Sequence, residues 1–177
     1  MRPSARKFVL ATHIAVSVAW IGAVLAYLPL DVAAATSSDV QTLRAAYVAM
    51  GLIAAWALVP LALAALVTGI VISVGTPWGL FRHYWVVFSL VLTAVAVAVL
   101  LVEWRLIADH AAVAADPATS DAELRALGHT LPHSVGGLVV LLAVLVLNVY
   151  KPRGLTRYGW RQQQREAARA GRSDGNG

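Results

Sequence analysis

Four long apolar stretches, almost free of charge, limit most strongly what this chain can fold into. An α-helix rises about 1.5 Å per residue, so about 20 apolar residues are needed to cross about 30 Å of hydrocarbon. Four stretches reach that length, at about residues 8–30, 45–74, 84–108 and 132–150. Lipid offers the backbone no hydrogen-bonding partner, so each span must be a helix, and no alternation of polar and apolar residues indicates a barrel. The sequence therefore predicts an all-α, polytopic membrane four-helix bundle.

The composition excludes a soluble enzyme and several kinds of site. Hydrophobic residues make up 59% of the chain and charged residues 13%, whereas an ordinary soluble domain is about 45–50% apolar and about 25% charged. Cysteine is absent, which rules out disulfides, thiolate metal sites, iron–sulfur clusters and a cysteine nucleophile. A bound haem or metal would have to use His, Met, a carboxylate, Tyr or Lys.

The positive charges are distributed unevenly about the spans. Eleven of the 14 Lys and Arg residues precede the first span, lie between the second and third, or follow the fourth. The other three lie on the opposite side. Because positive loops stay in the cytoplasm, we expect both termini inside and a location in the inner membrane. This asymmetry explains the net charge of +5 without a nucleic-acid partner. The expected partner is the lipid bilayer, and a homo-oligomer or another membrane protein stays open.

Two regions outside the spans carry local signals. Residues 1–158 are expected to form the transmembrane domain, and residues 159–177 a basic, largely disordered cytoplasmic tail, because the tail is polar and ends in Gly, Ser and Asn. In the longest outer loop, Ser120 and Glu123 have the spacing of a capping box, which predicts a short helix ending near Gly128. Within the second span, Pro60 predicts a bend.

One face of the first span is polar and aromatic. At about 100° per residue, a single face collects His13, Ser17, Trp20, Val24, Tyr27 and Asp31. We expect this stripe to face the other helices, since the opposite faces are aliphatic. An ionisable residue within a span is costly and marks a functional hypothesis. His13, Trp20 and Tyr27 are therefore candidate cofactor-binding residues, with simple packing as the alternative.

The depths of the histidines suggest two sites. His13 and His83 lie towards the cytoplasmic side, where they could ligate one haem b between the first and third spans. His133, Glu103 and His110 lie towards the outside, where a His/Glu/His cluster would suit a divalent metal.

Three motifs carry a resemblance to known families. They are Thr12-His-Ile-Ala-Val-Ser-Val-Ala-Trp-Ile-Gly22, Gly75-Thr-Pro-Trp-Gly-Leu-Phe-Arg-His-Tyr-Trp85 and Val149-Tyr-Lys-Pro-Arg-Gly-Leu-Thr-Arg-Tyr-Gly159. Over residues 5–161 the chain resembles a family of four-helix bacterial membrane proteins with no assigned activity. The first motif alone, a His seven residues before Trp-x-Gly, is similar to the first helix of the copper-resistance D family and of the membrane-bound protoporphyrinogen oxidase family, a four-helix haem b protein. That resemblance implies that His13 is an axial or metal ligand. With two methionines, the chain lacks the Met-rich character of a copper carrier.

These observations leave three functions open. The first is haem b binding for a redox or haem-metabolism role. The second is a metal-handling or permease-like function. The third is a structural accessory membrane protein without a cofactor, and the sequence does not decide whether the chain is an enzyme.

Overall fold

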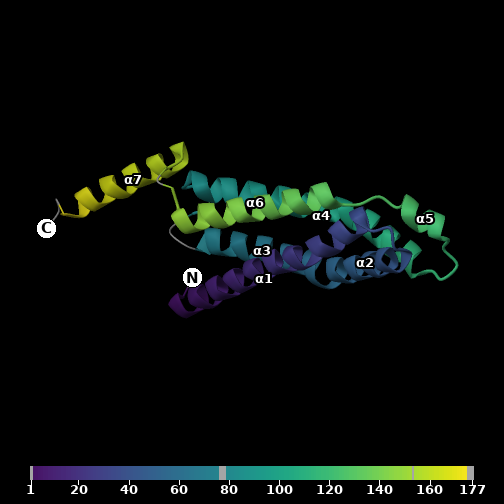
Figure 1. Cartoon of the computed structure of the whole chain (residues 1–177). Coiled ribbons are helices and arrows are strands. Elements are labelled where there is room, and N and C mark those ends of the chain that lie inside the picture. The colour runs from purple at the N-terminus through teal and green to yellow at the C-terminus, as the bar shows by residue number, and fades with distance from the viewer. Residues whose placement is uncertain (1, 76–78, 153, 175–177) are drawn as a thin grey trace.

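Four helices that are long and apolar enough to cross a membrane run alongside one another (Figure 1). The computed structural model describes residues 2–75, 79–152 and 154–174. The first span is α1 (Pro3–Thr36), the third α4 (Tyr84–Ala115) and the fourth α6 (Leu131–Tyr150). The second span, Val40–Gly75, is built from three helical segments. The predicted all-α membrane four-helix bundle is confirmed, and three of the spans extend beyond the predicted residues.

The second span changes its helical geometry just before Pro60. Here α2 (Val40–Ile53) passes into a π-helical turn, η1 (Ala54–Leu58), and then into α3 (Val59–Gly75). Proline has no N–H, and its ring clashes with the carbonyl four residues earlier, here that of Trp56. In the π-turn the N–H of Val59 bonds the carbonyl of Ala54, five residues back. The irregularity predicted from Pro60 is therefore present as a π-turn.

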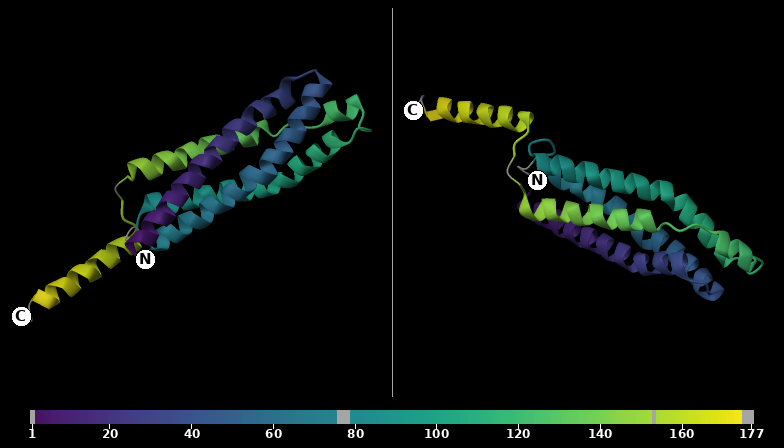
Figure 2. Two further views of the ribbon diagram at one scale, coloured as in Figure 1. Left: turned by 90° about the horizontal axis from the view of Figure 1, so that it is seen from below. Right: turned by 45° about the horizontal axis from the view of Figure 1, so that its top comes forward.

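The bundle places α1 and α4 at opposite corners. Each of these helices packs against α2, α3 and α6 (Figure 2). Between α2 and α4 the approach is very close, because a β-carbon placed at Gly51 would collide with the β-carbon of Ala111. Small residues at a helix crossing allow such close approach in membrane proteins.

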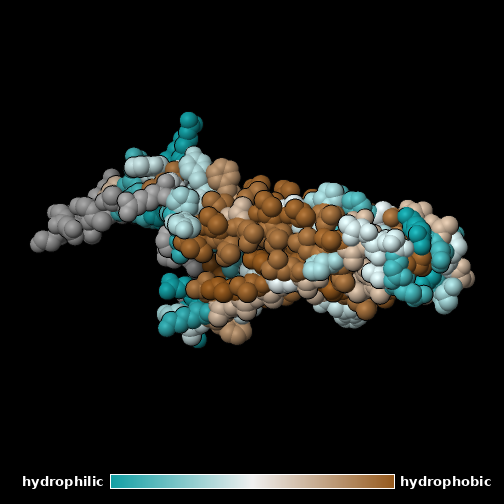
Figure 3. All heavy atoms as spheres, viewed as in Figure 1, coloured by the Kyte–Doolittle hydropathy of each residue, from teal (hydrophilic) through white to brown (hydrophobic). Residues whose placement is uncertain are grey.

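Three of the four spans, with 34, 36 and 32 residues, are longer than the bilayer is thick. With 20 residues, α6 is about 30 Å long and matches the hydrocarbon thickness of about 30 Å. With 32 residues, α4 is about 48 Å long. Figure 3 shows a hydrophobic belt along the middle of the bundle, with hydrophilic residues at both ends. We call these the terminal end, near both termini, and the α5 end, where α1, α2 and α4 continue past the start of α6.

Polar side chains close the α5 end. Arg44 of α2 donates from Nη1 to the carbonyls of Ala114 (2.6 Å) and Asp116 (2.7 Å), and from Nη2 to that of Thr119 (3.1 Å). It thereby satisfies carbonyls that the end of α4 leaves without helical partners.

The short helix predicted in the long loop is present. It is α5 (Asp121–Ala126), with the Ser120–Glu123 capping box complete. The helix ends two residues before Gly128. Leu124 is fully buried under the loop, and the Tyr47 hydroxyl donates to the carbonyls of Leu127 and Gly128 at 3.3 Å.

The tail, predicted to be largely disordered, is helical in the structure, and its disorder stays a prediction. It forms α7 (Arg157–Asp174), which projects from the terminal end (Figure 1). Its Gln, Arg, Ala and Glu residues are good helix formers. The Thr156 hydroxyl accepts a bond from the N–H of Gly159, and Arg82 pairs with Glu166 at 3.1 Å. These contacts connect α7 to the terminal end of the bundle. Residues 175–177 of the predicted tail lie outside the described residues.

Candidate functional site

The polar-aromatic face of α1 turns into the bundle, as predicted. Trp20 is 4% exposed, Tyr27 3% and Asp31 0%, and Val24 is buried with them. Residues on other faces of α1, such as Ile14, are exposed. The helical period of the stripe therefore identifies correctly which face of α1 packs.

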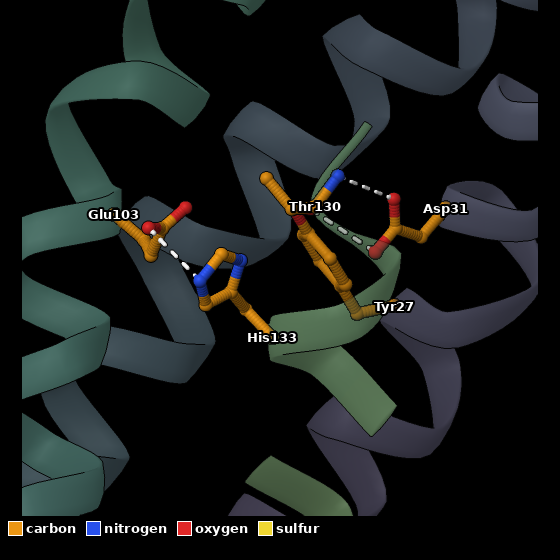
Figure 4. Close-up of polar contacts among 5 residues, drawn as sticks. All are labelled: Tyr27, Asp31, Glu103, Thr130 and His133. Atoms are coloured by element: carbon orange, nitrogen blue, oxygen red, sulfur yellow. Dashed lines mark hydrogen bonds and ion pairs between the residues drawn. The ribbon is translucent and has the colours of Figure 1, made fainter. Parts of the chain in front are cut away.

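Asp31 of α1 lies against the start of α6 and accepts three hydrogen bonds there, of which Figure 4 shows the two from Thr130. The backbone N–H of Thr130 donates at 3.1 Å, the Thr130 hydroxyl at 3.0 Å and the Ser134 hydroxyl at 2.7 Å. The first residues of a helix present unpaired N–H groups and a partial positive charge, which favour a carboxylate. The buried carboxylate is therefore well satisfied, and it ties α1 to α6.

Tyr27 extends this hydrogen-bond chain by one link. Its hydroxyl lies 2.9 Å from the Thr130 hydroxyl. The single hydroxyl proton of Thr130 goes to the Asp31 carboxylate, which can only accept when ionised. The Tyr27 hydroxyl must therefore be the donor, and the chain runs from Tyr27 through Thr130 to Asp31.

A second polar pair, Glu103 and His133, lies between α4 and α6 (Figure 4). Glu103 Oε1 is 3.6 Å from His133 Nε2, too far for a good hydrogen bond. The Glu103 side chain is 18% exposed and that of His133 53%. The other carboxylate oxygen, Glu103 Oε2, is buried and accepts no hydrogen bond from the described part of the chain. Burying such an acceptor without a partner costs about 1–3 kcal/mol, more when it is charged.

Glu103 and His133 border a cleft of about 280 Å³ between α1, α4 and α6. Polar residues of its wall gather at the α5 end, where Tyr27, Thr130 and Ser134 also lie. The rest of the wall is apolar and consists of Trp20, Val24, Leu58, Val95, Ala96, Val99, Leu100, Ile107, Pro132, Gly136, Gly137, Val140 and Leu141. A mainly apolar cleft with a few convergent polar groups is the usual form of a small-molecule site.

The cleft is polar towards the α5 end and apolar towards the membrane centre. Val95 precedes Glu103 by eight residues on α4, and Leu141 follows His133 by eight on α6, so the apolar part extends for about 12 Å along the helices. A β-carbon placed at Gly136 or Gly137 would meet nothing within 4 Å. The glycines therefore keep this part of the wall open.

His110 does not join the Glu103–His133 pair, so the structure does not bring the three predicted metal ligands together, and a metal site here stays a prediction. The His110 ring packs edge-on against Tyr47 of α2, with the ring centroids 5.6 Å apart. His110 shares a face of α4 with Glu103, but it lies seven residues further on, a shift of about 10 Å along the axis. No group of three His, Asp or Glu side chains within the described ranges could hold a metal ion.

His13 contacts α3 near the terminal end. Its Nδ1 lies 2.9 Å from the Thr68 hydroxyl, which itself donates to the carbonyl of Ala64 at 2.6 Å. The Thr68 proton is thus already committed, so His13 Nδ1 must carry the donated proton and Nε2 keeps its lone pair. Gly69 leaves room for the ring, since a β-carbon there would lie 3.1 Å from His13 Cε1.

His83 has a different environment. It is the N-cap of α4, it bridges to Leu155 beyond α6, and its ring centroid lies 6.4 Å from that of Trp85. Thr68 lies seven residues before the end of α3 and His83 follows that end, so the two histidines differ in depth by about 10 Å. The structure does not place them as facing ligands, and a haem between them stays a prediction. Residues 76–78 of the surrounding motif lie outside the described residues.

Thr130 and Ser134 are site residues that the sequence reasoning missed. The available signal was Asp31, a carboxylate on the packed face of α1 that needs donors. Comparison of the chain with models of protein families, with curated proteins and with solved structures returned no match.

Proposed function

We propose that this chain is a multi-pass membrane protein that binds a small, mainly apolar ligand in the cleft between α1, α4 and α6, in a permease-like role. The observation that carries the proposal is Glu103, a carboxylate that borders an apolar cleft and whose buried Oε2 has no hydrogen-bond donor among the described residues. An ionisable group kept at a cost within a membrane bundle marks a substrate or ion pathway.

The Asp31 network gives this cleft a fixed wall. Asp31, Thr130 and Ser134 hold the start of α6 against α1, and α6 carries His133 and the two glycines of the cleft. Rigid supporting hydrogen bonds keep binding groups in place. In this scheme Asp31 positions the wall and Glu103 meets the ligand.

We further propose that both termini are cytoplasmic and that the membrane is the inner one. The two termini lie at the same end of the bundle (Figure 1), and eleven of 14 positive residues belong to that side. The polar part of the cleft then lies towards the extracytoplasmic side.

Haem b at His13 is a second candidate, favoured by one observation. A histidine that ligates a metal usually donates its other ring N–H to a protein group, and the bond from His13 Nδ1 to Thr68 leaves Nε2 with its lone pair. The visible absorption spectrum of the purified protein tests this candidate. Haem b gives a Soret band that His13→Ala reduces, and a spectrum without that band rules the candidate out.

The cleft itself is tested by filling it. A photoreactive alkyl alcohol is crosslinked to the protein in lipid nanodiscs, and the labelled peptides are mapped by mass spectrometry. We expect labels on Val99 or Val140 in the wild type and loss of those labels in Gly137→Leu, which fills the cleft. Gly22→Leu is the matched control, since a β-carbon at this exposed glycine also meets nothing within 4 Å. Labelling that Gly137→Leu leaves unchanged would contradict cleft binding, and a structural accessory role would then remain.

A further inference from the structure

The wall of the cleft selects for the charge of its ligand. Glu103 and His133 are its ionisable side chains apart from the Tyr27 phenol, and neither Lys nor Arg contributes to it. Asp31 adds a second carboxylate directly behind Thr130. An anionic head group, such as that of a fatty acid, would lie beside acidic side chains here, whereas a cation would meet the carboxylate of Glu103.

An aromatic residue on the same wall favours a cation as well. Tyr27 borders the polar part of the cleft and is buried. The faces of aromatic rings attract ammonium groups, more strongly when water is excluded.

The shape of the cleft indicates that its ligand also has an apolar tail. From the polar residues of the cleft, valines and glycines line the wall for about 12 Å towards the membrane centre. Val95, Val99 and Gly136, on facing helices, are exposed on the membrane-facing surface, so the cleft opens laterally between α4 and α6. A molecule already dissolved in the bilayer can enter there with its head at the level of Glu103.

We propose, resting on the proposed function, that the ligand is an amphiphile with a protonated amine as head group. The ammonium donates to the Glu103 carboxylate, and the alkyl chain lies along the valines and glycines of α4 and α6. Two sources share this chemistry, the amine head of a bilayer phospholipid and a free alkylamine.

Three photoreactive probes with the same chain test the head group: a primary amine, an alcohol and a carboxylic acid. Labelling of α4 and α6 is measured against probe concentration in phosphatidylcholine nanodiscs. Because a hydrogen bond to a charged group is the stronger kind, we expect the amine to reach half-labelling at a concentration at least about tenfold below that of the alcohol. The carboxylic acid should label least. Equal labelling by amine and alcohol would overturn the inference, whereas labelling by none of the three would overturn the proposed function itself.

Glu103→Gln gives an independent test. It should bring amine labelling down to the level of alcohol labelling measured in the same variant. Glu166→Gln, at an exposed carboxylate on α7, is the control. Amine labelling that survives Glu103→Gln at the wild-type level contradicts the proposal. If Glu103→Gln does not fold, the comparison of the three probes on the wild type still tests whether the cleft prefers an amine head group.

A change of lipid distinguishes the two sources of the amine, a bilayer phospholipid and a free alkylamine. In nanodiscs that contain phosphatidylethanolamine, a fall in amine labelling supports the phospholipid as the ligand. Unchanged labelling supports a free alkylamine.

Discussion

Asp31 of α1 accepts hydrogen bonds from both the backbone N–H and the hydroxyl of Thr130, 99 residues later in the chain, at 3.1 and 3.0 Å. This relationship fixes where α6 begins. It also holds His133, three residues further on, at the level of Glu103. The geometry of the cleft thus depends on a buried carboxylate outside the cleft wall.

Asp31→Asn should lower the thermal stability of the purified protein more than Tyr27→Phe. The Asn amide presents an NH₂ group to donors that need an acceptor, and leaving such groups unsatisfied costs about 1–3 kcal/mol. Tyr27→Phe removes only the outermost donor of the chain, at about 0.5–1.5 kcal/mol. Thermal unfolding in detergent measures both, with the exposed Asp121→Asn as control. Equal midpoints for Asp31→Asn and the control would show that the network does not stabilise the bundle.

Gly51→Ala should destabilise the contact between α2 and α4, because the new methyl group collides with Ala111. Overpacking in a tight interior typically costs about 1–3 kcal/mol. Ala111→Gly in the same chain should recover a large part of the loss, since it removes the colliding atom. Gly22→Ala, where the added methyl meets nothing within 4 Å, should leave the unfolding midpoint unchanged. Additive effects of the two substitutions would argue against the close crossing.

The helix α5 should open as the pH falls. Hydrogen bonds from the backbone N–H and the hydroxyl of Ser120 lower the pKa of Glu123 below its ordinary value of 4.5. A carboxylate with a lowered pKa stabilises the folded state above the unfolded pKa, and that stability is lost as the pH falls through the folded pKa. Hydrogen exchange of the α5 amides, corrected for the intrinsic rate, should therefore show less protection at pH about 3 than at pH 7. In Glu123→Gln this change should disappear, and an equal change in that variant would refute the assignment.

Topology reporters should detect both termini in the cytoplasm and a tag inserted at Pro117 outside it. The reason is the excess of positive residues at the terminal end. Proteolysis or fluorescence of the fused reporters gives the answer for each site. A cytoplasmic signal from the tag at Pro117 would contradict the four-span arrangement.

Helical periodicity predicts the parts of this structure that depend on one segment at a time. The spans, the buried face with Trp20 and Tyr27, and the capping box of α5 all follow from local patterns. His110 shows the limit of that reasoning, because a shared face of α4 does not bring it to the same depth as Glu103.

Contacts between distant segments account for what local patterns miss. The partners of Asp31 lie about 100 residues away and follow from how α6 docks on α1. The contacts of α7 with Thr156 and Arg82 join segments far apart in the chain, and its polar composition does not predict them. Gly69 and Thr68, which receive His13, become visible only when α1 and α3 are packed together.

A structure of the protein in lipid nanodiscs with added dodecylamine tests whether the cleft binds an amine. We expect density for an elongated molecule in the cleft between α1, α4 and α6, with its nitrogen within hydrogen-bonding distance of the Glu103 carboxylate. The Asp31–Thr130 bonds should persist in that complex. A cleft closed by side chains, with Glu103 Oε2 bonded to a protein donor and no ligand density, would contradict amine binding in the cleft.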